Sequence, residues 1–120
     1  MINLFKVRVS ENTHLEVKRV LESGFIAQGA KVDEFEDLLQ AELKTDIKPV
    51  VVNSGTSAID LALELCDVGP GDEVISTAQT CFASQIGALH RHAVIRWADV
   101  DPITGLIDPE CVGKLIRSEE

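Results

Sequence analysis

The chain has 120 residues, 45% of them hydrophobic, and a formal net charge of −9, which fits one globular domain with a core. This acidic balance argues against binding to nucleic acid or to an anionic membrane surface, because no Lys/Arg cluster is present to neutralise phosphates. The three cysteines are widely spaced, which argues against a disulfide framework and against a zinc site. No apolar segment is long enough to span a membrane. We therefore expect a cytoplasmic protein without a metal.

Two helices are predicted in the first 45 residues. The first covers about residues 13–23, because Thr13 and Glu16 have the spacing of a capping box and Gly24 suits the position just after a helix. In the second helix, apolar side chains recur at helical spacing at Val32, Phe35, Leu39 and Leu43. We assign residues 1–45 to these N-terminal helices and expect them to pack outside the layer that follows.

A strand, a tight turn and a helix start are predicted where the sequence reads VVVNSGTSA. Residues 48–53 are expected to form the strand, and Ser54 is expected to cap the helix. The amides of Gly55, Thr56 and Ser57 would then be the first free donors of the helix, at its positive end. Such a turn can hold a phosphate, although an ordinary capped helix start uses the same residue types.

Strands and helices alternate in the rest of the chain. The helix after the turn is apolar on nearly all sides, so we expect it to be mostly buried. Strands are predicted at about residues 72–77 and 93–98, and a helix capped by Thr80 is predicted between them. Asp108 followed by Pro109 indicates the start of a last helix.

This alternation predicts the α/β class, with right-handed βαβ units and a parallel sheet covered by helices. We assign residues 1–120 to one incomplete α/β domain, in which residues 46–120 hold the βα units and the phosphate-binding turn. A parallel sheet of three strands leaves an edge unpaired. We therefore expect either further chain or a homo-oligomer to cover that edge.

Two pairs of polar residues have types that occur in metal or acid/base sites. Asp99 and Asp101 stand close together, but two carboxylates in a turn usually cap it or face solvent. His90 and His92 would point to different faces of a helix, so we interpret them as surface residues. No metal site is predicted.

Four segments of the chain together resemble the DegT/DnrJ/EryC1/StrS family of sugar aminotransferases, which are pyridoxal-phosphate (PLP) enzymes of the aspartate-aminotransferase fold. The segments read SGFIAQGAKVDEFE, VVNSGTSAIDLAL, DVGPGDEVIST and WADVDPITGLIDPE, in the family's order and at its spacing. The resemblance implies parallel βαβ layers as in the N-terminal part of a PLP-dependent transferase large domain, preceded by two helices. It also implies a homo-oligomer that transfers an amino group to a keto group on a nucleotide-linked sugar.

The resemblance also implies which residues bind the cofactor. In the family the turn that matches NSGTS binds the cofactor phosphate, which gives this role to Gly55, Thr56 and Ser57. An aromatic residue that stacks on the pyridine ring is usual at the position of Cys81, and Phe82 is next to it. Either Cys81 packs on the ring or Phe82 has taken over the stacking; the alternative that we favour for Phe82 is a place in the core.

No catalytic residue is assigned to this chain. In the family, the Lys that forms the Schiff base and the Asp that pairs with the ring nitrogen both lie downstream of the position that matches Glu120. None of the lysines of this chain matches a catalytic position. We interpret the chain as the N-terminal third of such an enzyme; the alternative is a truncated, non-catalytic protein that keeps the fold and binds a phosphate or a partner.

Overall fold

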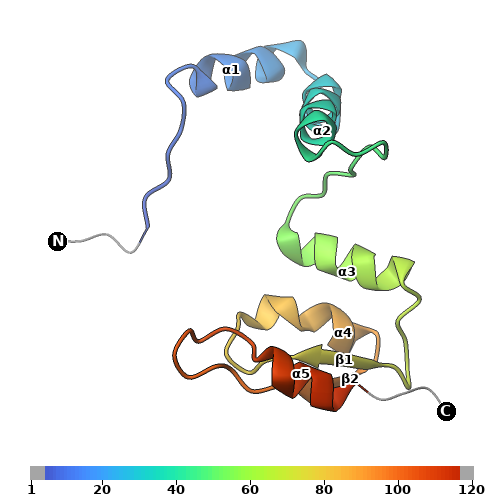
Figure 1. The fold of residues 1–120 in the computed structure, drawn as a ribbon. Helices are drawn as coiled ribbons and strands as arrows, with labels where there is room; N and C mark the ends of the chain where they lie inside the picture. The colour runs from blue at the N-terminus through green and yellow to red at the C-terminus, as the bar shows by residue number, and fades with distance from the viewer. Residues whose placement is uncertain (1–4, 117–120) are drawn as a thin grey trace. The chain divides into compact units, whose positions relative to one another are not determined.

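The computed structural model describes residues 5–116, which divide into two compact units on either side of the Val51–Val52 bond. The first unit holds two helices, and the second holds a small α/β layer (Figure 1). The elements are α1 (Thr13–Ser23), α2 (Ala30–Leu43), α3 (Gly55–Leu65), β1 (Glu73–Ser76), η1 (Phe82–Ser84), α4 (Ile86–His90), β2 (Val94–Trp97) and α5 (Pro109–Leu115).

Helix α1 confirms the predicted bounds but not the predicted capping box. Gly24 follows the helix with φ of 73°, a left-handed conformation that glycine adopts without the steric cost of a Cβ. At the other end the N-cap is Asn12, whose side chain makes no capping bond. The Glu16 carboxylate forms ion pairs with Arg19 and Lys31 instead, so it is not available to cap the helix.

The predicted strand at residues 48–53 is wrong, whereas the helix predicted before it is confirmed as α2. Pro49 has no amide hydrogen to donate to a neighbouring strand. The amide of Val51 donates to Glu36 Oε1 at 2.9 Å, and Glu36 is only 7% exposed. A side chain of α2 therefore takes the place of a strand partner for this segment.

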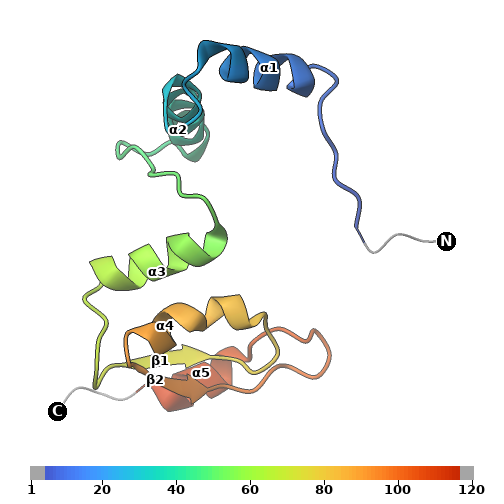
Figure 2. The ribbon, with the colours of Figure 1, turned by 180° about the vertical axis from the view of Figure 1, so that it is seen from behind.

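The sheet of the second unit has two parallel strands, which confirms the predicted direction of pairing. Glu73 of β1 is opposite Val94 of β2, and Ser76 is opposite Trp97. Helix α4 lies in the crossover between the strands, and α4 and α5 lie on opposite sides of them (Figures 1 and 2). The sheet has two strands instead of the predicted three because residues 48–53 do not join it.

Helix α3 is not mostly buried, contrary to the prediction. It has no buried residue, and Leu61 and Leu65 are 39% and 79% exposed. The 11 residues of α3 pack mainly against α4, which has only five, so most of the helix surface has no neighbour to cover it. Among the described residues of this unit, the buried hydrophobic ones are the small side chains Ala88, Ala93 and Ala98.

Two helix starts were predicted in the second half of the chain, and one of them is confirmed. Asp108 caps α5 by accepting a hydrogen bond from the amide of Glu110 at 2.8 Å, and Pro109 is the first helical residue. The helix predicted to begin at Thr80 is instead divided into η1 and α4. Cys81, and not Thr80, occupies the N-cap position of η1.

We expect Gly87→Val to destabilise the second unit. A Cβ at Gly87 would lie 3.1 Å from Leu63 Cδ1 and 3.3 Å from Asp60 Cα, and the second of these atoms belongs to the backbone of α3. Overpacking of this kind costs about 1–3 kcal/mol of unfolding free energy, which a urea titration would show as a lower midpoint. Gly113→Val is the matched control, because a Cβ at this helical glycine would meet no atom within 4 Å. Equal midpoints for the two variants would contradict the expected close packing.

Candidate functional site

The start of α3 and the carboxyl ends of β1 and β2 lie at the same end of the second unit (Figures 1 and 2). The contact between α3 and η1, which follows β1, agrees with this arrangement. Open parallel sheets bind ligands outside the carboxyl ends of their strands. The turn before α3 and the loops after the two strands therefore form one candidate site.

The turn before α3 is held by a network of three polar side chains. Ser54 is the N-cap, as predicted, and its hydroxyl oxygen accepts a hydrogen bond from the amide of Ser57 at 3.1 Å. The Ser57 hydroxyl donates to Asn53 Oδ1 at 2.8 Å and lies 2.9 Å from the Ser54 hydroxyl. The Ser57 amide is thus already used by the cap and is not one of the free donors that we predicted.

Two free amides remain at the start of α3. Within the part of the chain that the structure describes, the backbone amides of Gly55 and Thr56 have no hydrogen-bond acceptor. The Thr56 hydroxyl has no hydrogen-bond partner in this part of the chain either. A Cβ at Gly55 would meet no atom within 4 Å, so the space in front of this backbone is open. Two unpaired donors at the positive end of an 11-residue helix make a suitable place for an anion.

The loop after β1 is fixed to the sheet by Gln85. This residue is 7% exposed, and its side-chain amide donates to the Thr77 carbonyl at 2.8 Å and to the Ser76 hydroxyl at 3.2 Å. Gln85 is not among the site residues predicted from the sequence. The available signal was an uncharged polar residue directly before an apolar helical segment, and this pattern does not specify its partners.

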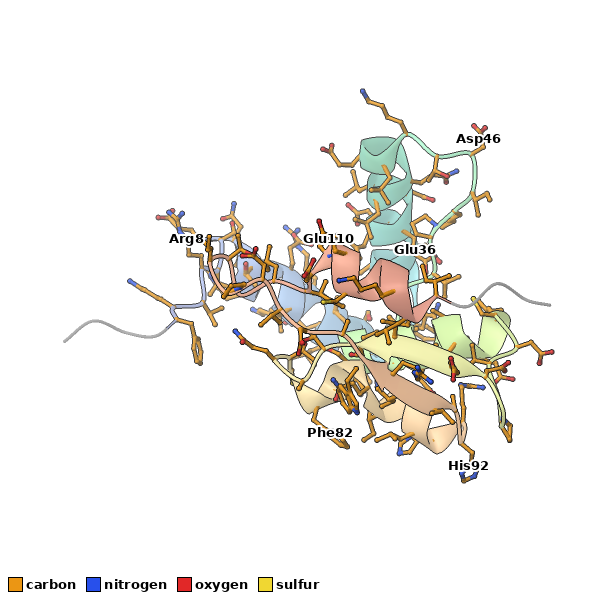
Figure 3. All side chains as sticks on the ribbon, turned by 60° about the horizontal axis from the view of Figure 1, so that its bottom comes forward. Arg8, Glu36, Asp46, Phe82, His92 and Glu110 are labelled. Atoms are coloured by element: carbon orange, nitrogen blue, oxygen red, sulfur yellow. The ribbon has the colours of Figure 1, made fainter. Side chains whose placement is uncertain are left out.

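Cys81 and Phe82 are both exposed on the same loop. Phe82 is 60% exposed, and Figure 3 shows its side chain projecting outward, so the interpretation of Phe82 as a core residue is wrong. The buried hydrophobic residues described in this unit are the small side chains Ala88, Ala93 and Ala98, and Phe82 is not among them. Both Cys81 and Phe82 are therefore accessible to a ligand at this end of the unit.

The loop after β2 is organised around Asp101. Its Oδ1 accepts hydrogen bonds from the Thr104 amide at 2.7 Å, the Thr104 hydroxyl at 3.0 Å and the Ile103 amide at 2.9 Å. These bonds, with the Thr104 amide foremost, lower the pKa of the Asp101 carboxyl. The aspartate thus stabilises a turn, as the sequence predicted.

Two negative observations apply to residues 5–116. No three His, Cys, Asp or Glu side chains of this range come together in a way that could hold a metal ion. No helix in the same range is long and apolar enough to cross a membrane. His90 and His92 are both exposed, as predicted for surface residues.

Comparison with protein families gives a match over nearly the whole chain. The sequence profile of the DegT/DnrJ/EryC1/StrS aminotransferase family matches residues 8–120. The spore coat polysaccharide biosynthesis protein SpsC of Bacillus subtilis is 40% identical over 94 residues, which are 78% of this chain and 24% of SpsC. A dTDP-3-amino-3,4,6-trideoxy-alpha-D-glucose transaminase of Streptomyces venezuelae is 43% identical over 72 residues, 60% of this chain and 19% of that protein.

The fold also matches solved structures. The PLP form of Spr1654 from Streptococcus pneumoniae superposes with a TM-score of 0.83 and 36% sequence identity, over 91% of this chain. The matched part is 28% of Spr1654. The chain thus spans about a quarter of the length of the relatives that it matches.

We expect Asp101→Asn to reduce the acid sensitivity of the second unit. Because the folded-state pKa of Asp101 is lowered, its charged form contributes stability that is fully present above its unfolded pKa of about 4 and is lost as the pH falls through the lower folded value. Unfolding midpoints measured from about pH 6 to pH 2 should therefore fall less steeply in the variant. Asp46→Asn is the control, since Asp46 has no hydrogen-bond or ion-pair partner among the described residues. Identical pH profiles for Asp101→Asn and the unmodified chain would refute the assignment.

Proposed function

Because the chain belongs to the DegT/DnrJ/EryC1/StrS aminotransferase family, we propose that it supplies the phosphate anchor for PLP in an enzyme that aminates a nucleotide-linked keto sugar. The observation that carries the proposal is the pair of unpaired amides at Gly55 and Thr56. The name of the transaminase from Streptomyces venezuelae describes a nucleotide-linked amino sugar, which supports this substrate class.

The residues of the turn fit a phosphate group. The amides of Gly55 and Thr56 and the Thr56 hydroxyl can donate to phosphate oxygens, and the positive end of α3 favours the negative charge. The absence of a Cβ at Gly55 leaves the backbone open to close approach. Ser57 contributes by holding the turn through Ser54 and Asn53, since its amide is used in the cap.

We also assign a contact with the pyridine ring to the loop after β1. Cys81 and Phe82 are both exposed on this loop, at the same end of the unit as the phosphate turn. Phe82 offers a flat aromatic face for stacking, whereas Cys81 offers a small apolar surface. Either contact would orient the ring relative to the anchored phosphate.

When bound, PLP supplies an aldehyde that accepts the amino group and a ring that takes up electrons. The residues of this chain bind and orient that group: the turn holds the phosphate, and the loop limits rotation of the ring. The lysine and the carboxylate that the reaction requires are not among the residues that the family resemblance assigns to this chain. The chain therefore acts in this proposal as the cofactor anchor.

Self-association and a cytoplasmic location stay predictions. In the described part of the second unit β1 pairs only with β2, so each strand has one edge without a strand partner. An exposed strand edge can pair with another chain. This gives a physical reason for the homo-oligomer that the family resemblance implies.

We expect Gly55→Val to weaken phosphate binding. The added side chain would occupy the open space in front of the free amides, and each charge-assisted hydrogen bond that is lost costs about 1.5–3 kcal/mol, which corresponds to more than a tenfold loss of affinity. Calorimetric titration with pyridoxine 5′-phosphate measures this effect, because this ligand has no aldehyde to react with surface lysines. Gly113→Val controls for the same change at a helical glycine with open space around it. Equal affinity in Gly55→Val, with an unchanged circular dichroism spectrum, would rule out this anchor.

We expect the 120-residue chain alone not to catalyse transamination. Without a lysine placed to hold the aldehyde and to move the proton, glutamate should not convert bound PLP to pyridoxamine phosphate faster than it converts free PLP. The measurement is the absorbance change after mixing chain, PLP and glutamate, with free PLP and glutamate as the control. Stoichiometric conversion at a single site would show that a lysine of this chain is catalytic and would overturn the anchor-only assignment.

A further inference from the structure

We infer that Gln85 is a positioning residue that sets where Cys81 and Phe82 stand relative to the cofactor ring. The inference rests on the proposed function, because it assumes that the loop after β1 contacts the ring. It goes further by naming the side chain that gives this loop a single position.

The side chain of Gln85 joins the far end of the loop to the end of β1. Its amide nitrogen has two hydrogens, and both are used, toward the Thr77 carbonyl at 2.8 Å and the Ser76 hydroxyl at 3.2 Å. Ser76 is the last residue of β1, and Thr77 is the first residue of the loop. The two ends of the loop are therefore fixed to each other at the carboxyl end of the sheet.

The backbone of Gln85 transmits this attachment to the two candidate ring contacts. The backbone amide of Gln85 donates to the Phe82 carbonyl at 3.0 Å, and the backbone amide of Ser84 donates to the Cys81 carbonyl at 2.9 Å. These bonds form η1, a short hydrogen-bonded turn that has Cys81 at its N-cap and Gln85 at its C-cap. A displacement of the Gln85 side chain would therefore move Cys81 and Phe82 together.

Packing alone does not require a glutamine at this position. Gln85 is 7% exposed and precedes the buried residues Gly87 and Ala88, so an apolar side chain of similar length would fill the same space. A buried amide costs free energy unless it is hydrogen-bonded, and its bonds give only a modest net stabilisation. The feature that glutamine adds over an apolar residue is the fixed geometry of its two bonds.

The other side-chain bonds of the loop are exposed and long. The backbone amide of Gln79 donates to the Thr77 hydroxyl at 3.3 Å, and the hydroxyl oxygens of Thr80 and Ser84 are 3.4 Å apart. Bonds of this kind compete with water and hold a loop weakly. Among the side-chain hydrogen bonds of the loop in the described residues, those of Gln85 are thus the ones that are shielded from solvent in part.

The test compares two ligands that differ in whether they engage the loop. Inorganic phosphate uses only the turn at Gly55 and Thr56, whereas pyridoxine 5′-phosphate also presents a ring. We expect Gln85→Met to reduce the affinity for pyridoxine 5′-phosphate by about tenfold, equivalent to one lost hydrogen bond, and to leave the affinity for inorganic phosphate within about twofold. Gln28→Met is the control, because Gln28 is exposed and its side chain makes no hydrogen bond in the described structure.

A second variant separates the positioning role from a fault in folding. Ser76→Ala removes the longer of the two bonds and should reduce the affinity for pyridoxine 5′-phosphate in the same direction but by less. If Gln85→Met keeps the ligand preference of the unmodified chain, the inference is wrong and the phosphate anchor stands. If Gln85→Met loses affinity for both ligands equally, Gln85 has a general structural role, and this result would also overturn the inference. If the unmodified chain binds neither ligand, the proposed function itself fails.

Discussion

The hydrogen bond from the Ser57 amide to the Ser54 hydroxyl is the interaction on which the candidate site depends. By capping α3 from within the turn, it fixes where the helix begins and uses one of the terminal amides. The Ser57 hydroxyl also donates a hydrogen bond to the side chain of Asn53, the residue before Ser54. The amides of Gly55 and Thr56 have no acceptor among the described residues, so this cap leaves two free donors at the start of α3.

The turn and the loop after β1 belong to one packed body. Arg91, which follows α4, forms ion pairs with two carboxylates of α3. Its Nη1 lies 2.5 Å from Glu64 Oε2, its Nε lies 3.5 Å from Asp60 Oδ1, and its side chain is largely shielded from solvent. Gly87 of α4 allows the two helices to approach closely, since even a Cβ there would press on α3. The helix that carries the turn is therefore held against the helix that follows the loop, so a shift in one would affect the other.

The features that the sequence predicted correctly depend on short-range interactions. Gly24 ends α1, Ser54 caps α3 and Asp108 caps α5 because each needs only a few neighbouring residues to form its bonds. The parallel pairing of β1 and β2 follows from the alternation of strand and helix. Residues 8–120 also carry enough of the family pattern to identify the family.

The features that the sequence did not predict depend on partners that are distant in the chain. Residues 48–53 have strand composition, but a strand needs a neighbour, and here Glu36 binds the Val51 amide instead. The exposure of α3 depends on how much surface its neighbours can cover, which its own apolar composition does not reveal. Gln85 was missed because its role depends on hydrogen bonds to Ser76 and Thr77, and a single polar residue in a sequence does not indicate which groups accept its hydrogen bonds.

The cap network has an entropic consequence. Asn53, Ser54 and Ser57 are hydrogen-bonded to one another, so in the anchor that we propose a phosphate would meet donors on a backbone that the turn's own bonds hold in place. Little conformational freedom remains to be lost on binding, which lowers the entropic cost of association. In the anchor that we propose, the turn would contact only the phosphate group and would not distinguish one phosphate monoester from another. The choice of one phosphorylated compound over another therefore belongs to the part of the ligand that lies beyond the phosphate.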